Sequence, residues 1–174
     1  SIYSKTVICC AGLYSGGEKL GSDGSIYRLL KELGLKTVKI TPSIVQLKTV
    51  TDFTRQLKGI KVDAKASLLK NDRVVAEYTD EVLFCDYGLS GPAIMNISRE
   101  AMRSEDNYTV SLDLFPNTEK NALAESISSR IKLLGYRSLE EFFTGFLNKR
   151  LGQVILKYCG YKLSDKADCL GACD

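Results

Sequence analysis

The chain has 174 residues, of which 44% are hydrophobic, so it can bury a core as one domain or two small ones. Its formal net charge is +3, and the basic residues are interspersed among acidic ones, which argues against a nucleic-acid partner. The absence of histidine excludes Ser-His-Asp and Cys-His catalysis and histidine metal sites. No apolar run approaches the roughly 20 residues that span a bilayer, and no signal-peptide pattern opens the chain. We therefore expect a cytoplasmic protein with no membrane partner.

Residues 1–40 read as one strand, one turn and one helix. Residues 5–10 include a continuous apolar run at residues 7–10, which is typical of a buried strand in a parallel sheet. Apolar residues at helical spacing follow over residues 24–33, with Ser22 or Asp23 as the expected N-cap and Gly34 as the stop. A single unit of this kind cannot cover both faces of its strand, which suggests a truncated chain.

The glycine-rich turn at residues 11–24 only partly resembles a phosphate-binding loop. Gly12 and Gly17 have the spacing of a Walker loop, but Glu18 stands where that loop needs lysine. The dinucleotide fingerprint G-x-G-x-x-G is absent as well. From the residues alone, a flexible turn before a helix is the favoured interpretation.

Residues 41–115 change to a strand-rich pattern. Residues 60–68 alternate strictly between apolar and polar, which predicts a half-buried antiparallel strand. Residues 70–73 (KNDR) predict a hairpin turn, with further strands at 43–50, 74–84 and 108–115. Between them, Ser90 is the expected N-cap of a helix that starts at Gly91 or Pro92. We expect a small antiparallel sheet or partly open barrel.

Residues 116–174 are predicted to be helical. A first helix should run from Asn117 or Thr118 to residue 134, before a capping-box pattern formed by Ser138 and Glu141. Residues 139–147 carry a dense apolar face, and Asn148 divides them from a last helix that ends at Gly160. The fold class is therefore α+β, with a small antiparallel, barrel-like sheet followed by a helical unit.

Two sets of polar residues are weak candidates for chemistry. Asp80, Glu81 and Asp86 are close in sequence, but acids beside an alternating strand are more often solvated edges than a catalytic pair. Three cysteines gather near the C-terminus without a fourth ligand, so we expect free, mostly buried thiols and no bound zinc. The six cysteines are Cys9, Cys10, Cys85, Cys159, Cys169 and Cys173.

Five stretches in one order resemble a known family. They are VICCAGLYSGGEKLGSDGSIYRLLKELG, TPSIVQLKT, EVLFCDYGLSGPAIMNISR, SLDLFP and FLNKRLGQVILKYCG. The series resembles the central part of the YhiN-like (BaiN-like, aminoacetone oxidase) FAD-dependent oxidoreductases, and residues 88–94 (GLSGPAI) are its most specific part. The resemblance implies that residues 1–40 are a remnant of a Rossmann-type FAD-binding domain. Residues 41–174 would be its insert domain, β-rich over 41–115 and helical over 116–174.

The resemblance also implies cofactor contacts. The family's Ala-Thr-Gly-Gly stretch aligns with residues 10–13, of which Gly12 is kept, and its Gly-Ser-Thr-Gly-Asp-Gly-Tyr run aligns with residues 21–27. The implied FAD-contacting residues are Ala11, Gly12, Leu13, Gly21 and Ser22. No catalytic or metal-binding residue is implied.

The resemblance implies an oxidoreductase whose redox chemistry is carried by FAD. The insert would cover the flavin and shape the pocket of a small-molecule substrate, and the partners of this chain would be the flanking FAD-binding segments. The chain alone is expected to be inactive and to bind no FAD. A non-enzymatic binding or interaction module is the alternative.

Overall fold

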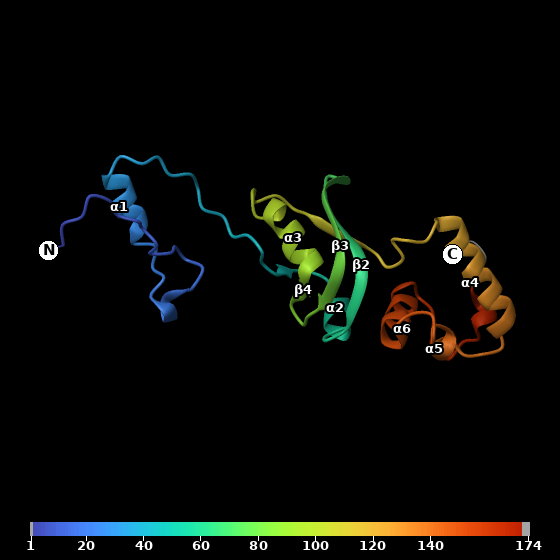
Figure 1. The fold of residues 1–174 in the computed structure, drawn as a ribbon. Helices are drawn as coiled ribbons and strands as arrows, with labels where there is room; N and C mark the ends of the chain where they lie inside the picture. The colour runs from blue at the N-terminus through green and yellow to red at the C-terminus, as the bar shows by residue number, and fades with distance from the viewer. Residues whose placement is uncertain (1, 172–174) are drawn as a thin grey trace. The chain divides into compact units, whose positions relative to one another are not determined.

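The computed structural model describes residues 2–171 (Figure 1). Residue contacts divide the chain into two units, Ser1–Ile40 and Thr41–Asp174, which are described separately below. The division falls between residues 40 and 41, where the sequence pattern changes from a single βα unit to strands. The assignment of the first part to a cofactor-binding domain stays a prediction.

The first unit contains one α-helix and almost no core. A 3-10 turn (η1, Glu18–Leu20) precedes helix α1 (Ile26–Glu32), which ends before Gly34 at a left-handed φ of 79°. The helix is where the sequence predicts it, but its N-cap is Ser25 rather than Ser22 or Asp23. The Asp23 carboxylate instead accepts a hydrogen bond from the Ser25 N–H at 2.9 Å, which closes the turn before the helix.

The strand expected at residues 5–10 does not form. This segment has no regular secondary structure, and Val7 and Ile8 are 82% and 84% exposed. A strand is stabilised by hydrogen bonds to a neighbour and by packing on its faces, and no other strand occurs among the described residues of this unit. The apolar run alone is therefore not sufficient to make a strand.

The second unit is built on one antiparallel sheet. Its strands are β1 (Leu47–Lys48), β2 (Lys61–Lys70), β3 (Arg73–Phe84), β4 (Gly88–Ser90) and β5 (Thr109–Asp113). They are ordered β1-β4-β3-β2-β5, and every pairing is antiparallel. This confirms the α+β class and the predicted antiparallel sheet, although the first strand is shorter than the predicted 43–50.

The long hairpin of β2 and β3 follows directly from the sequence. Asn71 and Asp72 connect the strands with φ angles of 49° and 60°, a two-residue turn of the type that matches the twist of a hairpin. The alternation predicted for residues 60–68 is confirmed, because Ala64, Ala66 and Leu68 are fully buried on one face. The opposite face is polar and solvated, with ion pairs such as Lys61–Glu81 at 2.9 Å.

Helix α3 (Pro92–Ala101) covers the buried face of this hairpin, as Figure 1 shows. Its N-cap is Gly91 and not Ser90, which belongs to β4 and pairs with Leu83 of β3. The predicted Ser90 cap is therefore wrong, because the sheet extends one residue further than the Ser-Gly-Pro pattern indicates. The short helix α2 (Phe53–Gln56) and residues of the C-terminal helix α6 complete the core. The buried members of this core include Leu57, Leu68, Val82, Phe84, Ile94, Ile97 and Leu151.

The C-terminal part is helical, as predicted. It comprises α4 (Lys120–Leu134), α5 (Leu139–Phe142), α6 (Lys149–Tyr158) and a 3-10 turn, η2 (Ala167–Cys169). The helix expected at 139–147 is a single turn, after which Gly145 adopts a left-handed φ of 78°. The predicted boundary at Asn148 is confirmed: its side-chain oxygen accepts from the N–H groups of Arg150 and Leu151 at 3.1 and 3.2 Å. A second small core packs here, from Leu139, Phe142, Leu156 and Ala167.

No helix in residues 2–171 is both long and apolar enough to cross a membrane.

Candidate cofactor loop and groove

The glycine-rich loop of the first unit is closed by its own backbone. The Gly17 N–H donates to the Tyr14 carbonyl at 3.0 Å, and the Gly17 carbonyl accepts from the N–H groups of Leu20 and Ser22, both at 3.1 Å. These bonds fold residues 14–22 into successive tight turns. The structure therefore agrees with the interpretation of this stretch as a glycine turn before a helix.

All five residues implied to contact FAD lie in or beside this loop. Gly12 and Gly21 have left-handed φ angles of 69° and 72°, and nothing lies within 4 Å of the position that a Cβ atom would occupy. Ala11 and Leu13 are exposed and Ser22 is half-buried. Among the described residues, no hydrogen bond joins 11–13 to 21–22. The structure thus leaves two separate short surfaces, and their cofactor role stays a prediction.

Tyr14 is a residue of the loop that the sequence pattern does not reveal. A Cβ atom at Gly24 would stand 2.3 Å from Tyr14 Cε1, so the phenol ring packs directly on the Gly24 backbone. Gly24 is buried for this reason and also has a left-handed φ of 72°. The only signal in the sequence was the glycine itself, since the contact depends on how the intervening turns fold.

The backbone of the loop is open to a ligand, but its charge disfavours a phosphate. The hydrogen bond from the Ser25 N–H lowers the pKa of Asp23, so this carboxylate is ionised at neutral pH. A negative charge two residues after Gly21 disfavours a nearby pyrophosphate. Helix α1 has only 7 residues, so its dipole compensates little. The loop therefore offers open glycine backbone at Gly12 and Gly21, and the charge of Asp23 makes it unsuited to bind a pyrophosphate.

The acidic candidates of the second unit are engaged in surface contacts. Asp86 lies 2.7 Å from Lys58 and Glu81 lies 2.9 Å from Lys61. The Asp80 carboxylate accepts a hydrogen bond from the Glu81 N–H at 2.7 Å. The ammonium group of Lys58 lowers the pKa of Asp86. A carboxylate with a lowered pKa is a poor general acid, so Asp86 is unsuited to that role. Asp86 and Glu81 form solvated ion pairs and Asp80 accepts a backbone hydrogen bond, as expected for the edge of a strand.

Tyr87 lies in the turn between β3 and β4, where its hydroxyl donates to the side-chain oxygen of Gln46. Its pKa is raised, first by a hydrogen bond to the Cys85 side chain and then by partial desolvation. The phenol is therefore neutral at physiological pH. Its position ties the segment before β1 to the sheet, which is a structural role.

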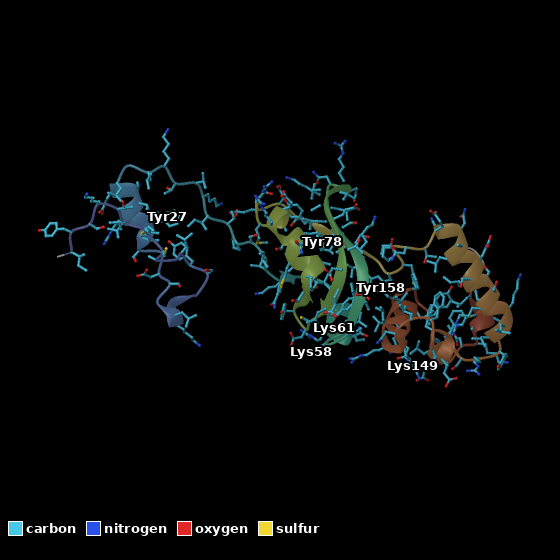
Figure 2. All side chains as sticks on the ribbon, in the orientation of Figure 1. Tyr27, Lys58, Lys61, Tyr78, Lys149 and Tyr158 are labelled. Atoms are coloured by element: carbon cyan, nitrogen blue, oxygen red, sulfur yellow. The ribbon has the colours of Figure 1, made fainter. Side chains whose placement is uncertain are left out.

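A groove of about 450 Å³ opens between the sheet and the helical part of the second unit. Figure 2 labels Lys61 at the start of β2 and Lys149 at the start of α6, the two elements whose ends flank it. Phe115 and Phe146 form a tilted pair within it, with ring centroids 5.4 Å apart. The groove is shallow and largely open to solvent in this chain. The groove is lined by Lys61, Val62, Asp63, Leu114, Phe115, Gly145, Phe146, Leu147 and Asn148.

The cysteines are more exposed than predicted. Cys9, Cys10, Cys159 and Cys169 are exposed free thiols and Cys85 is half-buried, so the expectation of mostly buried thiols is wrong. Cys9 and Cys10 are exposed because the strand that would bury them does not form, and Cys159 follows the last turn of α6. Cys173 lies outside the described residues. Residues 2–171 contain no group of three or more side chains that could hold a metal ion.

Comparisons with known proteins identify the family. Residues 41–170 match the family described as HI0933-like protein barrel and H2TH domain. A 3-dehydro-bile acid delta(4,6)-reductase from Clostridium scindens is 30% identical over 150 residues, an alignment that covers 84% of this chain and 36% of the reductase. The aligned chain thus spans about a third of the length of that relative. The resemblance predicted from the sequence is confirmed, and the chain belongs to the HI0933-like family, with residues 41–170 corresponding to its barrel and H2TH domain.

Proposed function

We propose that this chain is the central part of an FAD-dependent oxidoreductase, and that residues 41–174 are a domain inserted into its flavin-binding domain. The observation that supports this most directly is the 30% identity to a reductase of which the chain covers 36%. The aligned segment is about a third of the reductase, and we assign the flavin-binding segments to the rest of the longer protein. The bound flavin would supply hydride transfer to a small organic substrate.

The first unit would contribute one wall of the cofactor site. Gly12 and Gly21 leave their backbone open to a ligand, as a close approach to a dinucleotide requires. Asp23 argues that the pyrophosphate lies elsewhere, at a helix N-terminus supplied by the flanking segments. The exposed apolar run at residues 7–10 would then gain neighbouring strands from the same segments.

The second unit would cover the flavin and shape the substrate pocket. The groove beside Phe115 and Phe146 offers aromatic surface, with Lys61 and Asp63 as polar groups among its lining residues. Such a lining would hold the apolar part of a substrate and orient its polar end once the flanking segments cover it. The relative's substrate is a bile acid derivative by name, so an apolar ring substrate is the class we propose for the longer protein.

Flavin absorbance of purified protein tests this proposal. The 174-residue protein should be colourless after purification and after incubation with FAD, because we assign the pyrophosphate-binding turn to the flanking segments. A longer protein that includes the flanking segments on both sides should be yellow, with an absorbance band near that of free flavin. A second test is the extended protein with Gly12→Val. The valine side chain would occupy the open space beside the Gly12 backbone, so this variant should retain less flavin. A colourless extended protein would contradict the proposal, and a yellow 174-residue protein would contradict the role given to the flanking segments.

A further inference from the structure

The connection into the second unit changes character at one residue, Ile44. No hydrogen bond of the described residues involves 36–44, and Val38 and Ile44 are 85% and 72% exposed. From Val45 onward the chain is held: the Val45 N–H donates to the Ser98 hydroxyl at 3.1 Å, and Leu47 pairs with Leu89 of the sheet. The free connection and the folded unit therefore meet between Ile44 and Val45.

Ile44 is strained at this junction. Its φ is 57°, in the left-handed region, where a β-branched side chain is a genuine outlier. The side chain is exposed, so packing does not compensate for the strain. Strain of this kind persists only where neighbouring contacts hold the backbone, and the nearest such contact is the bond from Val45 to Ser98.

Ser98 is built to receive that bond. It lies on α3 with no exposed surface, and its hydroxyl donates its own proton to the Met95 carbonyl at 2.7 Å. The hydroxyl oxygen is thereby oriented to accept from Val45. When Val45 departs, Ser98 keeps its bond to Met95, so opening does not leave the buried hydroxyl without any partner.

We propose that Ile44, Val45 and Ser98 form a conformational latch that sets the length of the free connection between the two units. In the latched state the connection ends at Ile44, which is held in the left-handed conformation. In the unlatched state Ile44 relaxes, Val45 is released, and the connection extends toward β1. The strain of one non-glycine left-handed residue offsets part of the contribution of the hydrogen bond and the pairing beyond it, so the unlatched state is a minor but populated state. The latch does not depend on FAD, and it stands or falls separately from the proposed oxidoreductase activity.

Amide hydrogen exchange, resolved by residue with NMR on the 174-residue protein, tests the latch through the Val45 N–H. Ser98→Ala should accelerate exchange at Val45 about fivefold, the size expected for one hydrogen bond, and leave Leu89 unchanged. The matched control is Ser67→Ala, which removes another buried serine hydroxyl, bonded to Glu77 at 2.9 Å, and should leave Val45 unchanged.

Ile44→Asn provides the opposite test, because asparagine tolerates the left-handed region and its side chain would be exposed here. Relief of strain should slow Val45 exchange about tenfold. Val38→Asn, an exposed position of the same connection, is the control and should have no effect. This test remains decisive if Ser98→Ala fails to fold, since Ile44→Asn removes no core contact. Unchanged or faster Val45 exchange in Ile44→Asn would overturn the latch, as would unchanged exchange in a folded Ser98→Ala variant.

Discussion

Two stretches that carry apolar side chains differ in burial. Residues 7–10 (VICC) are exposed and irregular, whereas Ala64, Ala66 and Leu68 of β2 are fully buried. Strand β2 has β3 and β5 as hydrogen-bonding neighbours and a helix on one face, and residues 7–10 have neither within their unit. An apolar run therefore identifies a segment that would be stabilised by burial. Whether the segment is buried depends on the neighbouring strands and helices.

Glycines show the same contrast at a smaller scale. Gly12, Gly17 and Gly21 in the first unit have open space where a Cβ would stand. At Gly91 in the second unit, a Cβ would stand 2.6 Å from the Glu81 carbonyl oxygen. Gly12, Gly17 and Gly21 therefore serve turns, whereas Gly91 lets one backbone segment approach another closely.

The largest effect should come from the two apolar stretches themselves. Leu68→Ala removes a fully buried side chain and should lower the free energy of unfolding by about 2–5 kcal/mol. Ile8→Ala truncates a side chain that is 84% exposed and should change the free energy of unfolding by less than about 0.5 kcal/mol. Urea titration followed by circular dichroism measures both. A cost for Ile8→Ala comparable to that of Leu68→Ala would mean that residues 7–10 are covered in solution.

Gly91→Ala should have the next largest effect and lower the free energy of unfolding by about 2–3 kcal/mol. Its φ of 95° is unfavourable for alanine, and the added methyl group meets the backbone of β3. Gly145→Ala is the control: its φ is 78°, but the Cβ position is open, so only the conformational cost of about 1 kcal/mol applies. Equal costs in urea titration would show that the backbone contact at Gly91 relaxes easily.

Arg130 joins α4 to the turn after α5, and Arg130→Ala should cost about 2 kcal/mol. Its guanidinium donates to the carbonyls of Phe142 and Thr144 at 2.7 and 2.6 Å and lies 5.5 Å from the centre of the Phe146 ring. Arg137→Ala, which removes a ring contact with Tyr136 at the surface, should cost less than about 0.5 kcal/mol. Thermal unfolding distinguishes the two, and a similar shift for both would remove the special role of Arg130.

Local signals predicted much of the second unit. Strict alternation over residues 60–68 and the KNDR turn determine the β2–β3 hairpin, because period-2 burial and a two-residue turn are properties of neighbouring residues. Asn148 was predicted as a boundary and is an N-cap. Ser90 was predicted as a cap and is not one, since its role depends on a pairing with Leu83 that local sequence does not contain.

The candidate site was less predictable than the fold. The cofactor role that the family resemblance implies for residues of the glycine-rich loop stays a prediction, and the ring of Tyr14 over Gly24 depends on three-dimensional folding of that loop. The groove beside Phe115 and Phe146 joins residues more than 30 positions apart in the sequence, which no local pattern reveals.

The helix caps provide the next prediction. Asn148→Ala should cost about 1 kcal/mol, because the side chain accepts two backbone hydrogen bonds at the start of α6. Ser138 occupies the N-cap position of α5 without a side-chain hydrogen bond, so Ser138→Ala should cost only a few tenths of that, roughly 0.3 kcal/mol. Urea titration of both variants measures the difference. A cost for Ser138→Ala as large as that for Asn148→Ala would indicate that the predicted capping box forms in solution.

The smallest effect should come from the ion pair of Lys58 and Asp86. The Lys58 ammonium group, 2.7 Å away, holds the pKa of Asp86 below its usual 3.8. A carboxyl group whose pKa is lowered by folding stabilises the folded state above the unfolded pKa, and this contribution is lost as pH falls through the folded pKa. Side chains of both residues are about half exposed, so salt should screen the interaction.

Carbon-13 NMR of the Asp86 carboxyl should show its pKa rising toward 3.8 in Lys58→Met, and rising partly in wild-type protein at high salt. Lys61→Met, which removes the partner of Glu81 instead, is the control and should leave Asp86 unchanged. If Lys58→Met does not raise the Asp86 pKa, the two side chains do not interact in solution, and the ionised state of Asp86 has another cause.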